Sequence, residues 1–489
     1  MLRTRQQYYE KLKGMRDNVY IGGKLLNRAD PLVRGGVNVI GVTFDAAFDP
    51  ETKDLVTTTS HLNGEPISRF LHVYQTQDDL YKKQQMLRKL CHVVGGCIQR
   101  CMGTDGSNAL YVTTKECDDK YGTPYHERFK KWLDYAQRND LVVNCAQTDV
   151  KGDRSKRPFE QVDPDLYVRI VERREDGIVV CGCKAHNTIA PYADEILVIP
   201  TRLMSENDKD WAVAFAIPAD AEGVSLVCRS TSSRPRKHIK APYNYYGMCD
   251  SMTVFDHVFI PNERVFMNGE YKFAGRLALS FANNHRFSYC GCKPAVTDVI
   301  MGATALVADC NGIAKAGHVK DELTEMAIIA ELVYGAGIAS AATSNVTSSG
   351  AYEPNFLYTN CGRYHAGMNI YHEYDVLASI AGGFPATMPP EDDYFNPATK
   401  EYMDKYIMRN PEFSAEDTHR LFRFISDLSV SAHCGVSQYA GVHGGGSPVM
   451  ERIGIRGFYD FESKKQIIRD LAGITNKNSL HKGVMEDNK

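Results

Sequence analysis

The sequence lacks the features that would direct it to nucleic acid or to a membrane. Its 489 residues hold 57 Lys and Arg against 60 Asp and Glu, and the formal charge of −3 gives no basic excess for either partner. The N-terminus is charged and has no apolar core, so we expect no secretory signal there. The longest apolar run, 326–342, contains Glu331, Gly335 and Gly337, and we expect it to be a buried bundle helix, too short and too polar to span a bilayer.

Two phosphate-binding motifs are also missing. The chain has no Walker-type loop and no Gly-x-Gly-x-x-Gly motif that opens a helix after a strand, so nothing supports a Rossmann-type nucleotide site. Cysteine, in contrast, is plentiful. Fourteen cysteines without an export signal favour a reducing compartment, in which thiols stay free or bind metal. We therefore expect a cytoplasmic protein with a small-molecule site.

Apolar periodicity predicts an α+β chain with more than one domain. Helical spacing recurs in two regions, over 8–15, 79–102 and 125–139 and then over 273–283, 296–309, 318–344 and 413–434. Between these regions, β-type runs surround Asp176-Gly177, a strong hairpin signal, and favour an antiparallel sheet or a small barrel. The predicted division is an N-terminal helical domain (1–140), a middle antiparallel β domain (141–268) and a C-terminal helical bundle (269–489).

Two pairs of potential metal ligands stand at helical spacing. Cys97 and Cys101 are one turn apart and His285 and Cys292 two turns apart, so two helices could present three thiols and an imidazole to a common point. On a helix Cys290 points roughly 140° away from His285, which favours Cys292 as the ligand. This donor set suits zinc or an iron–sulfur cluster, and spacing does not decide between them. Ordinary core packing is the alternative for each pair.

Other polar residues accompany these ligands. Tyr289 and Lys293 follow His285 on one helical face and can donate protons beside a metal, with packing and surface exposure as the alternatives. The loop 148–154 and the strand end 186–188 offer polar groups to a cofactor, or form solvated turns. A basic run either meets the phosphates of a ligand such as coenzyme A or forms a solvated loop: Arg229, Arg234, Arg236, Lys237, His238 and Lys240.

Several longer motifs occur across nearly the whole chain. They are Cys-x-x-x-Cys at 97–101, Thr-Asp-x-Lys-Gly-Asp-Arg at 148–154, Lys-Ala-His at 184–186, Phe-Asp-x-Val-Phe-Ile-Pro at 255–261, His-x6-Cys at 285–292, Ile-Ala-Gly-Gly at 380–383 and His-Gly-x-Gly-Ser-Pro at 443–448. Together they resemble the 4-hydroxyphenylacetate 3-hydroxylase family, and within it the flavin and iron–sulfur branch that dehydrates 4-hydroxyacyl-CoA thioesters. The four cysteine and histidine ligands are the specific part, because the flavin monooxygenases of the family lack them.

The resemblance implies an acyl-CoA dehydrogenase-like fold, a homotetramer and roles for particular residues. It implies a [4Fe-4S] cluster on Cys97, Cys101, His285 and Cys292. It implies FAD bound by Gln147, Thr148, Asp149, Lys151, Gly152, Asp153, Arg154, His186, Asn187, Thr188, Gly382 and Gly383. The implied catalytic roles are His285 as a base, Tyr289 as an acid, Thr188 positioning flavin or substrate, and Lys293 and Gln99 in the substrate pocket.

The implied activity is a radical elimination of the 4-hydroxybutyryl-CoA to crotonyl-CoA type, with vinylacetyl-CoA Δ-isomerisation as a second activity. Two positions depart from the pattern. Asp250 and Ala440 stand where the resemblance leads us to expect glutamates. An alanine cannot transfer protons, so the resemblance does not decide whether the chain isomerises vinylacetyl-CoA or which acyl group it accepts. Gln438 or Tyr439 could take the place of the missing glutamate. The alternatives are a flavin-dependent aromatic monooxygenase, a dehydratase with a different acyl substrate, and a zinc-stabilised helical scaffold without turnover.

Overall fold

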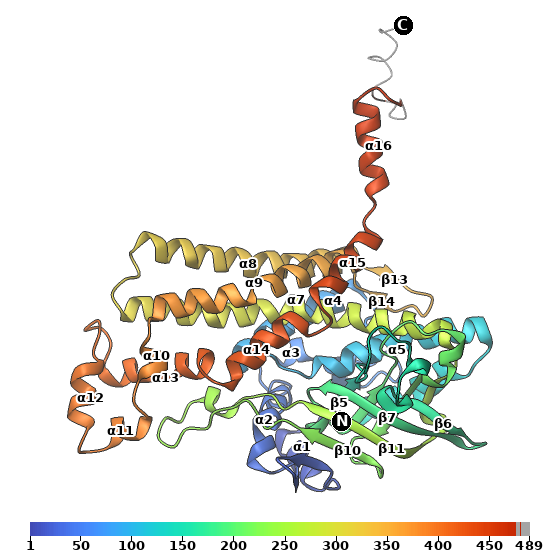
Figure 1. The fold of residues 1–489 in the computed structure, drawn as a ribbon, viewed down its shortest axis with the longest axis horizontal. Helices are drawn as coiled ribbons and strands as arrows, with labels where there is room; N and C mark the ends of the chain where they lie inside the picture. Colours follow the sequence, from blue (N-terminus) through green and yellow to red (C-terminus); the bar gives the residue numbers. More distant parts are fainter. Residues whose placement is uncertain (476–479, 481–489) are drawn as a thin grey trace.

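The computed structural model describes residues 1–475 and Leu480, and shows an α+β body from which one helical arm projects (Figure 1). The N-terminal helices are α1 (Arg5–Lys13), α2 (Pro31–Asp45), α3 (Lys53–Val56), α4 (Gln77–Val94), α5 (Cys101–Tyr121) and α6 (Tyr125–Arg138). Short strands lie between them: β1 (Val19–Ile21), β2 (Lys24–Leu26), β3 (Thr57–Thr59) and β4 (Pro66–Ser68). The helices predicted over 8–15 and 125–139 are confirmed, whereas α2 and α5 were not predicted.

The helix predicted over 79–102 is wrong at its C-terminal end. α4 stops at Val94, because Gly95 adopts a left-handed conformation (φ 65°) and caps the helix. The chain then forms a loop, in which Gln99 also has a positive φ of 65°. Cys97 lies in this loop and Cys101 is the first residue of α5, so the two thiols do not share a helical face as expected.

The middle of the chain folds into two sheets that share a core. Its strands are β5 (Val143–Ala146), β6 (Arg169–Arg173), β7 (Gly177–Asn187), β8 (Glu195–Val198), β9 (Val213–Pro218), β10 (Val224–Cys228), β11 (Ser251–Pro261) and β12 (Val265–Asn268). One sheet has the strand order β2-β1-β10-β11-β7-β6 and the other β12-β9-β8-β5. Val180 of the first sheet, Phe215 of the second and Tyr8 of α1 belong to one apolar cluster.

Strand pairing confirms the predicted hairpin and corrects the predicted sheet. β6 and β7 pair antiparallel around Asp176-Gly177, with Arg173 opposite Ile178. The expectation of an antiparallel sheet is wrong at two places, because β1 pairs with β10 and β5 with β8 in parallel. Apolar alternation shows which residues face the core but not which strand lies alongside. Since β1 and β2 come from the first 26 residues, the N-terminal region completes the middle sheet.

After β12 the chain is mainly helical. The elements are α7 (Tyr271–Cys310), α8 (Gly317–Ala342), β13 (Asn345–Val346), β14 (Tyr352–Glu353), α9 (Phe356–Ala381), α10 (Phe384–Thr387), α11 (Glu391–Phe395), α12 (Lys400–Ile407), α13 (Ala415–Ser429), α14 (Ala432–His443), α15 (Pro448–Phe458) and α16 (Phe461–Leu471). Short 3-10 turns lie at Arg69–Leu71, Pro158–Glu160, Pro164–Leu166, Ala190–Tyr192, Glu206–Trp211, Pro242–Tyr245 and Asn262–Arg264. α7, α8 and α9 pack against one another above the sheets, and α16 forms the arm (Figure 1).

α7 is the element that places most of the predicted site. The sequence predicts two helices, 273–283 and 296–309, but α7 runs unbroken over 40 residues and accommodates Pro294. It packs against α4, α5, α8 and α9. The apolar period is interrupted between the two predicted helices because several polar side chains there, including His285 and Tyr289, face a cavity.

Two helices, α7 and α8, are long and apolar enough to cross a membrane by length and composition. The expectation that 326–342 is too short is therefore wrong, because this run belongs to the 26-residue α8. The apolar window of α7 is 61% buried inside the chain and that of α8 39% buried. α7 is thus a core helix, whereas α8 leaves apolar side chains such as Ile328 and Leu332 on the surface. The expected absence of a membrane span stays a prediction.

We expect a buried histidine to make the C-terminal helices sensitive to acid. His419 of α13 is fully buried and stacks on Tyr394 at 4.1 Å, and neither of its ring nitrogens has a hydrogen-bond partner within 1–475 or at Leu480. Burial is the main cause that lowers the pKa of His419 from 6.5 to about 4. The unfolded chain binds this proton near pH 6.5, so the stabilisation is complete above that pH and is lost as the pH falls toward 4.

We therefore expect His419→Phe to reduce the acid-induced fall in the apparent Tm between pH 6.5 and 4, followed by circular dichroism. Phenylalanine fills a similar volume and has no proton to bind. The control is His257→Phe, since the His257 side chain is 75% exposed. Equal pH dependence of Tm in the wild type and His419→Phe would contradict the assignment.

Candidate active site

A cavity of about 1640 Å³ lies where the N-terminal helices, the sheets and α7 meet. Its walls come from the loop between α4 and α5, the segment after β5, the end of β7, the middle of α7, and α14 with α15. These segments are far apart along the chain, so the fold alone brings their side chains together. A cavity of this size admits a large cofactor together with part of a substrate.

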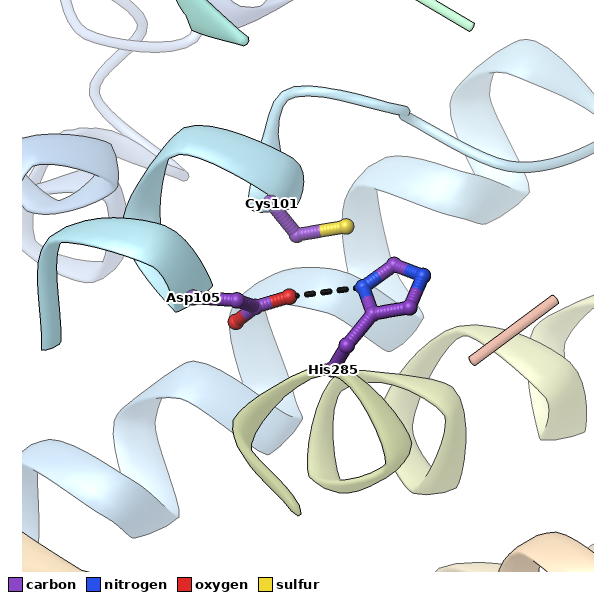
Figure 2. Close-up of side chains that lie close together, drawn as sticks. All are labelled: Cys101, Asp105 and His285. Carbon is purple, nitrogen blue, oxygen red and sulfur yellow. Dashed lines mark hydrogen bonds and ion pairs between the residues drawn. The ribbon is translucent and has the colours of Figure 1, made fainter. Parts of the chain in front are cut away.

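Three thiols and one imidazole meet on the cavity wall. Cys97, Cys101, His285 and Cys292 all line it. The Cys97 thiol is within hydrogen-bonding reach of the Cys101 and Cys292 thiols, and Cys101 is within reach of His285. Figure 2 shows the Cys101 side chain on α5 close to the His285 ring on α7. The structure thus collects the four predicted metal ligands in one place, although Cys97 comes from a loop.

Asp105, which the sequence analysis missed, stands beside two of these ligands. Cys101 Sγ, an Asp105 carboxylate oxygen and a His285 ring nitrogen lie within 4.8 Å of one another (Figure 2). Asp105 Oδ2 is 2.8 Å from His285 Nδ1. A signal for it exists in the sequence, because Asp105 follows Cys101 by four residues, one turn along α5.

Cys290 lies on another side of α7. It is fully buried, and its Sγ is 3.8 Å from the carbonyl oxygen of Thr359 on α9. A Cβ added to Gly362 would lie 2.9 Å from this sulfur, which shows how tightly Cys290 is packed against α9. Cys290 is not among the cavity residues, whereas Cys292 is. This geometry agrees with the helical-face interpretation.

The donor set fits a positively charged metal centre. For Cys97, the hydrogen bond with Cys101 lowers the thiol pKa, but the bond with Cys292 and burial outweigh it and hold the pKa well above 9. The bond with Cys97, followed by burial, also raises the pKa of Cys101 well above that value. Such thiols carry their protons until a cation displaces them. Three cysteines and one histidine are a ligand set for zinc or for an iron–sulfur cluster.

Three contacts hold Tyr289 one turn beyond His285. Its hydroxyl donates a hydrogen bond to the carbonyl oxygen of Ala440 at 2.6 Å. Its ring packs edge-on against His285, with centroids 5.6 Å apart, and the Arg363 guanidinium lies 4.4 Å from the ring centroid. Burial raises the pKa of Tyr289 above 10, so the phenol keeps its proton. A Cβ on Gly444 would lie 1.9 Å from this hydroxyl, so the close approach requires glycine there.

Lys293 lines the cavity but also forms a buried ion pair. Its Nζ contacts the carboxylate of Glu373 on α9 and donates a hydrogen bond to Thr297 at 2.9 Å. The Lys293 and Glu373 side chains are 3% and 0% exposed, which excludes the surface alternative. Removal of the ammonium group would leave a buried carboxylate unpaired and would destabilise the fold.

Three non-glycine residues on the cavity wall have a left-handed backbone. Their φ angles are 65° at Gln99, 76° at Lys151 and 61° at His186. Strain of this kind persists where the surrounding structure enforces it, and it concentrates at binding sites. Gln99 is fixed further by hydrogen bonds to the carbonyl oxygen of Gly247, at 3.0 Å, and with the Tyr192 hydroxyl.

The predicted FAD-binding residues divide into two groups. Seven line the cavity: Gln147, Thr148, Lys151, Arg154, His186, Asn187 and Thr188. Burial lowers the pKa of Lys151, and the nearby Arg154 and Arg202 lower it further, because three cations share this wall. A concentration of positive charge of this kind suits phosphate oxygens.

The other predicted FAD-binding residues do not reach the cavity in this chain. Asp149 is buried in a 2.8 Å ion pair with Lys184. A Cβ on Gly152 would meet Gln161 Oε1 at 2.5 Å, and the Asp153 carboxylate turns toward Ser155. Gly382 lines a separate cavity of about 350 Å³, and Gly383 lines neither. A sequence motif covers every residue of a loop, but successive side chains of the loop point in different directions, so only some of them face the cavity.

The basic run is partly solvated, as one of its two interpretations expects, because Arg234, Lys237 and Lys240 are exposed, but the chain also pairs most of its charges internally. Arg236 bonds to Asp427 of α13, and Lys237 and His238 bond to Asp392 of α11 at 2.8 and 2.7 Å. The run therefore attaches its loop to the C-terminal helices. From this run, Arg229 alone lines the cavity, and it pairs with Asp250 at 2.5 Å.

Carboxylates are scarce on the cavity wall. In the part of the chain that the structure describes, Asp250 is the only acidic residue there. Ala440 also lines the cavity and offers its backbone carbonyl to Tyr289. Of the two substitutes expected for a glutamate, Tyr439 lines this cavity, whereas Gln438 lines the smaller one.

The chain matches two sequence models of one family, described as the N-terminal and C-terminal parts of 4-hydroxyphenylacetate 3-hydroxylase, over residues 4–267 and 274–473. A 4-hydroxybutyryl-CoA dehydratase/vinylacetyl-CoA-Delta-isomerase of Clostridium aminobutyricum is 41% identical over 489 residues, which cover 97% of this chain and 100% of that protein. The oxygenase component of a 4-hydroxyphenylacetate 3-monooxygenase from Thermus thermophilus is 26% identical, over 88% of this chain and 89% of that protein.

A solved structure shares the fold closely. An oxygen-tolerant archaeal 4-hydroxybutyryl-CoA dehydratase from N. maritimus superposes with a TM-score of 0.93 at 36% identity, over 98% of this chain and 96% of that chain. The confirmed part of the fold prediction is thus a mixed helix and sheet chain with a helical C-terminal region. The two sequence models and the relative covered over its whole length show that the chain belongs to the 4-hydroxyphenylacetate 3-hydroxylase family.

Proposed function

We propose that this chain is a hydro-lyase that removes water from a 4-hydroxyacyl-CoA thioester, in a reaction of the 4-hydroxybutyryl-CoA to crotonyl-CoA type, with FAD and a [4Fe-4S] cluster as cofactors. The observation that carries the proposal is the convergence of Cys97, Cys101, Cys292 and His285 on the wall of a large cavity. The similarity to 4-hydroxybutyryl-CoA dehydratases over nearly the whole chain supports it. The finer fold assignment, an acyl-CoA dehydrogenase-like arrangement, belongs to the same proposal.

The cationic wall is the proposed flavin site. Lys151 and Arg154 offer charge to phosphates, and the strand end from His186 to Thr188 offers hydrogen bonds, with Thr188 positioning flavin or substrate. The four-ligand cluster site faces the same cavity from the α4–α5 loop, α5 and α7. When bound, FAD supplies one-electron chemistry and the cluster supplies a Lewis-acidic iron for the departing hydroxyl.

The residues of the chain would then handle protons. The Tyr289 phenol, which burial keeps protonated, is placed to donate a proton to the leaving hydroxyl. Asp105 engages Nδ1 of His285, which leaves Nε2 free for a metal or a substrate proton. The Lys293 ammonium, whose charge is balanced by Glu373, offers N–H donors on the same helix face. Gln99 and Asp250 are held by their own hydrogen bonds in positions that would orient the acyl chain.

Because of Ala440, two properties have to be measured: whether the chain isomerises vinylacetyl-CoA, and which acyl chain it accepts. The methyl group of Ala440 transfers no proton, so vinylacetyl-CoA isomerisation requires another group on this wall, and Tyr439 is the candidate that lines the cavity. A smaller side chain also leaves room for a longer acyl chain. A panel of 4-hydroxyacyl-CoA thioesters that differ in length and branching would identify the substrate.

We also propose that the chain assembles as a homotetramer and works in the cytoplasm. The assembly is supported by apolar side chains that the single chain leaves on its surface. Ile467, Ile468 and Leu471 of the α16 arm are at least half exposed, as are Ile328 and Leu332 of α8. Exposed apolar surface of this extent marks a protein interface. Light scattering after gel filtration would measure the mass.

Metal analysis of anaerobically purified protein tests the proposal directly. The expected result is about four irons and four sulfides per chain, with flavin absorbance and dehydration of a 4-hydroxyacyl-CoA. Zinc in place of iron, or no metal, would overturn it. Oxygen consumption with a phenolic substrate and a flavin reductase would indicate an aromatic monooxygenase. A colourless protein without turnover would indicate a scaffold.

A further inference from the structure

A buried carboxylate with no part in the proton transfers above lies directly behind the His285 ring. Asp105 is fully buried on α5, and its Oδ2 is 2.8 Å from His285 Nδ1 (Figure 2). Ser288, three residues beyond His285 on α7, donates its hydroxyl to both oxygens, at 2.8 and 3.0 Å. Asp105 Oδ1 also accepts a hydrogen bond from Lys83 Nζ at 2.5 Å. The carboxylate is thus held by three helices, α4, α5 and α7.

Lys83 balances the charge of this carboxylate. Its side chain is 1% exposed, and it contacts Asp105 and the hydroxyl of Tyr74. Burial lowers the pKa of Lys83, but Asp105 and Tyr74 outweigh this effect and raise it above 10.5, so the ammonium stays charged. Because the pair is neutral as a unit, Asp105 can hold the imidazole without adding net negative charge beside three thiolates.

The hydrogen bonds of Asp105 favour a role as the partner of a ligand over a role as a ligand itself, because both of its oxygens are already used. One oxygen is used by Lys83 and Ser288, and the other by His285 and Ser288. When Asp105 accepts the Nδ1 proton of His285, the unprotonated nitrogen is Nε2. A carboxylate behind an imidazole fixes both the tautomer and the plane of the ring, and makes the ring a better ligand.

We propose that Asp105 is a positioning residue for the metal centre: it fixes the His285 ring so that Nε2 is the metal-binding nitrogen, with Lys83 and Ser288 holding the carboxylate in place. This inference rests on the proposed function, because it assumes that His285 binds iron. It goes further by assigning the binding nitrogen and the group that selects it. The triad of carboxylate, imidazole and metal is built from Asp105 on α5 and His285 on α7.

The test compares Asp105→Asn with the wild type after ¹⁵N-histidine labelling. We expect Asp105→Asn to keep its helical circular dichroism and bound flavin, to bind iron about 10- to 100-fold more weakly, and to show an altered ¹⁵N hyperfine coupling in pulsed EPR of the reduced cluster. Asp105→Asn leaves the Lys83 ammonium without its partner. If this variant does not fold, the Lys83→Met/Asp105→Asn double variant removes the buried charge and gives the same comparison.

Asp298→Asn is the matched control. Asp298 of α7 also contacts a histidine, His92 of α4, at 2.7 Å and pairs with Arg88, but it does not line the cavity. This variant should leave the iron content and the hyperfine coupling unchanged. Unchanged values in a folded Asp105→Asn protein that holds iron would overturn the inference, while the proposed function stands.

Failure of the proposed function has a different signature. If the wild-type protein holds zinc and no iron, the proposed iron–sulfur cluster is wrong. The positioning role of Asp105 is then tested by comparing the visible spectra of the cobalt(II)-substituted wild type and Asp105→Asn. Identical cobalt spectra overturn the role of Asp105, and a shifted spectrum supports it. A wild-type chain that binds no metal overturns both.

Discussion

Cys292→Ala is expected to abolish iron binding and dehydration together. Cys292 lines the cavity, and its thiol contacts that of Cys97, so its loss removes one of four metal ligands. The effect on turnover should exceed the roughly 10- to 100-fold loss caused by removing an outer partner of a metal ligand. Iron and sulfide per chain, and the visible absorbance of the cluster, are the direct readouts. Flavin binding depends on other residues of the cavity wall, such as Lys151 and Arg154, and should persist.

Cys290→Ala is the matched control, two residues away on the same helix. Cys290 packs against α9 and lies off the cavity wall, so its replacement removes only a small buried side chain. We expect a loss of about 1 kcal/mol in the free energy of unfolding, with iron content and activity retained. Bleaching of the protein by Cys290→Ala, or an intact cluster in Cys292→Ala, would show that the ligand assignment on α7 is wrong.

The sequence could predict the α7 half of this site because one helix contains it. His285, Tyr289, Cys292 and Lys293 lie within nine residues, and helical geometry alone decides which of them face one side. The α4–α5 half was predicted for the wrong physical reason. Cys97 and Cys101 meet through a loop with two left-handed residues, Gly95 and Gln99, and not through a shared helical face.

Apolar periodicity could not predict which residues these side chains contact. Asp105 comes from α5, Arg363 and Glu373 from α9, and the Ala440 carbonyl oxygen from α14, and each contact depends on how those three helices pack against α7. The prediction of strand direction failed for the same reason, because the parallel pairs β1–β10 and β5–β8 join segments that are distant in sequence. Local pattern predicts elements and their faces, whereas long-range pairing decides which charges are neutralised and which reach the cavity.

Tyr289→Phe separates proton transfer from cluster assembly. The phenyl ring can keep its position between His285 and the Arg363 guanidinium, so the fold, iron content and flavin absorbance should be those of the wild type. The variant lacks the hydroxyl that Ala440 holds at 2.6 Å, and with it the proposed proton donor. We expect kcat to fall about 10²- to 10⁴-fold, the usual contribution of a positioned acid, with little change in KM.

Tyr406→Phe provides the control for the substitution itself, because Tyr406 lies on α12, is 69% exposed and is not among the cavity residues. Its kcat should equal that of the wild type. An unchanged kcat in an iron-replete Tyr289→Phe protein would rule out Tyr289 as the acid. If kcat falls only in proportion to the loss of bound iron, Tyr289 contributes to packing around the cluster and not to proton transfer. A fall at full iron occupancy is the outcome that only a proton donor explains, since the ring and its neighbours are otherwise unaltered.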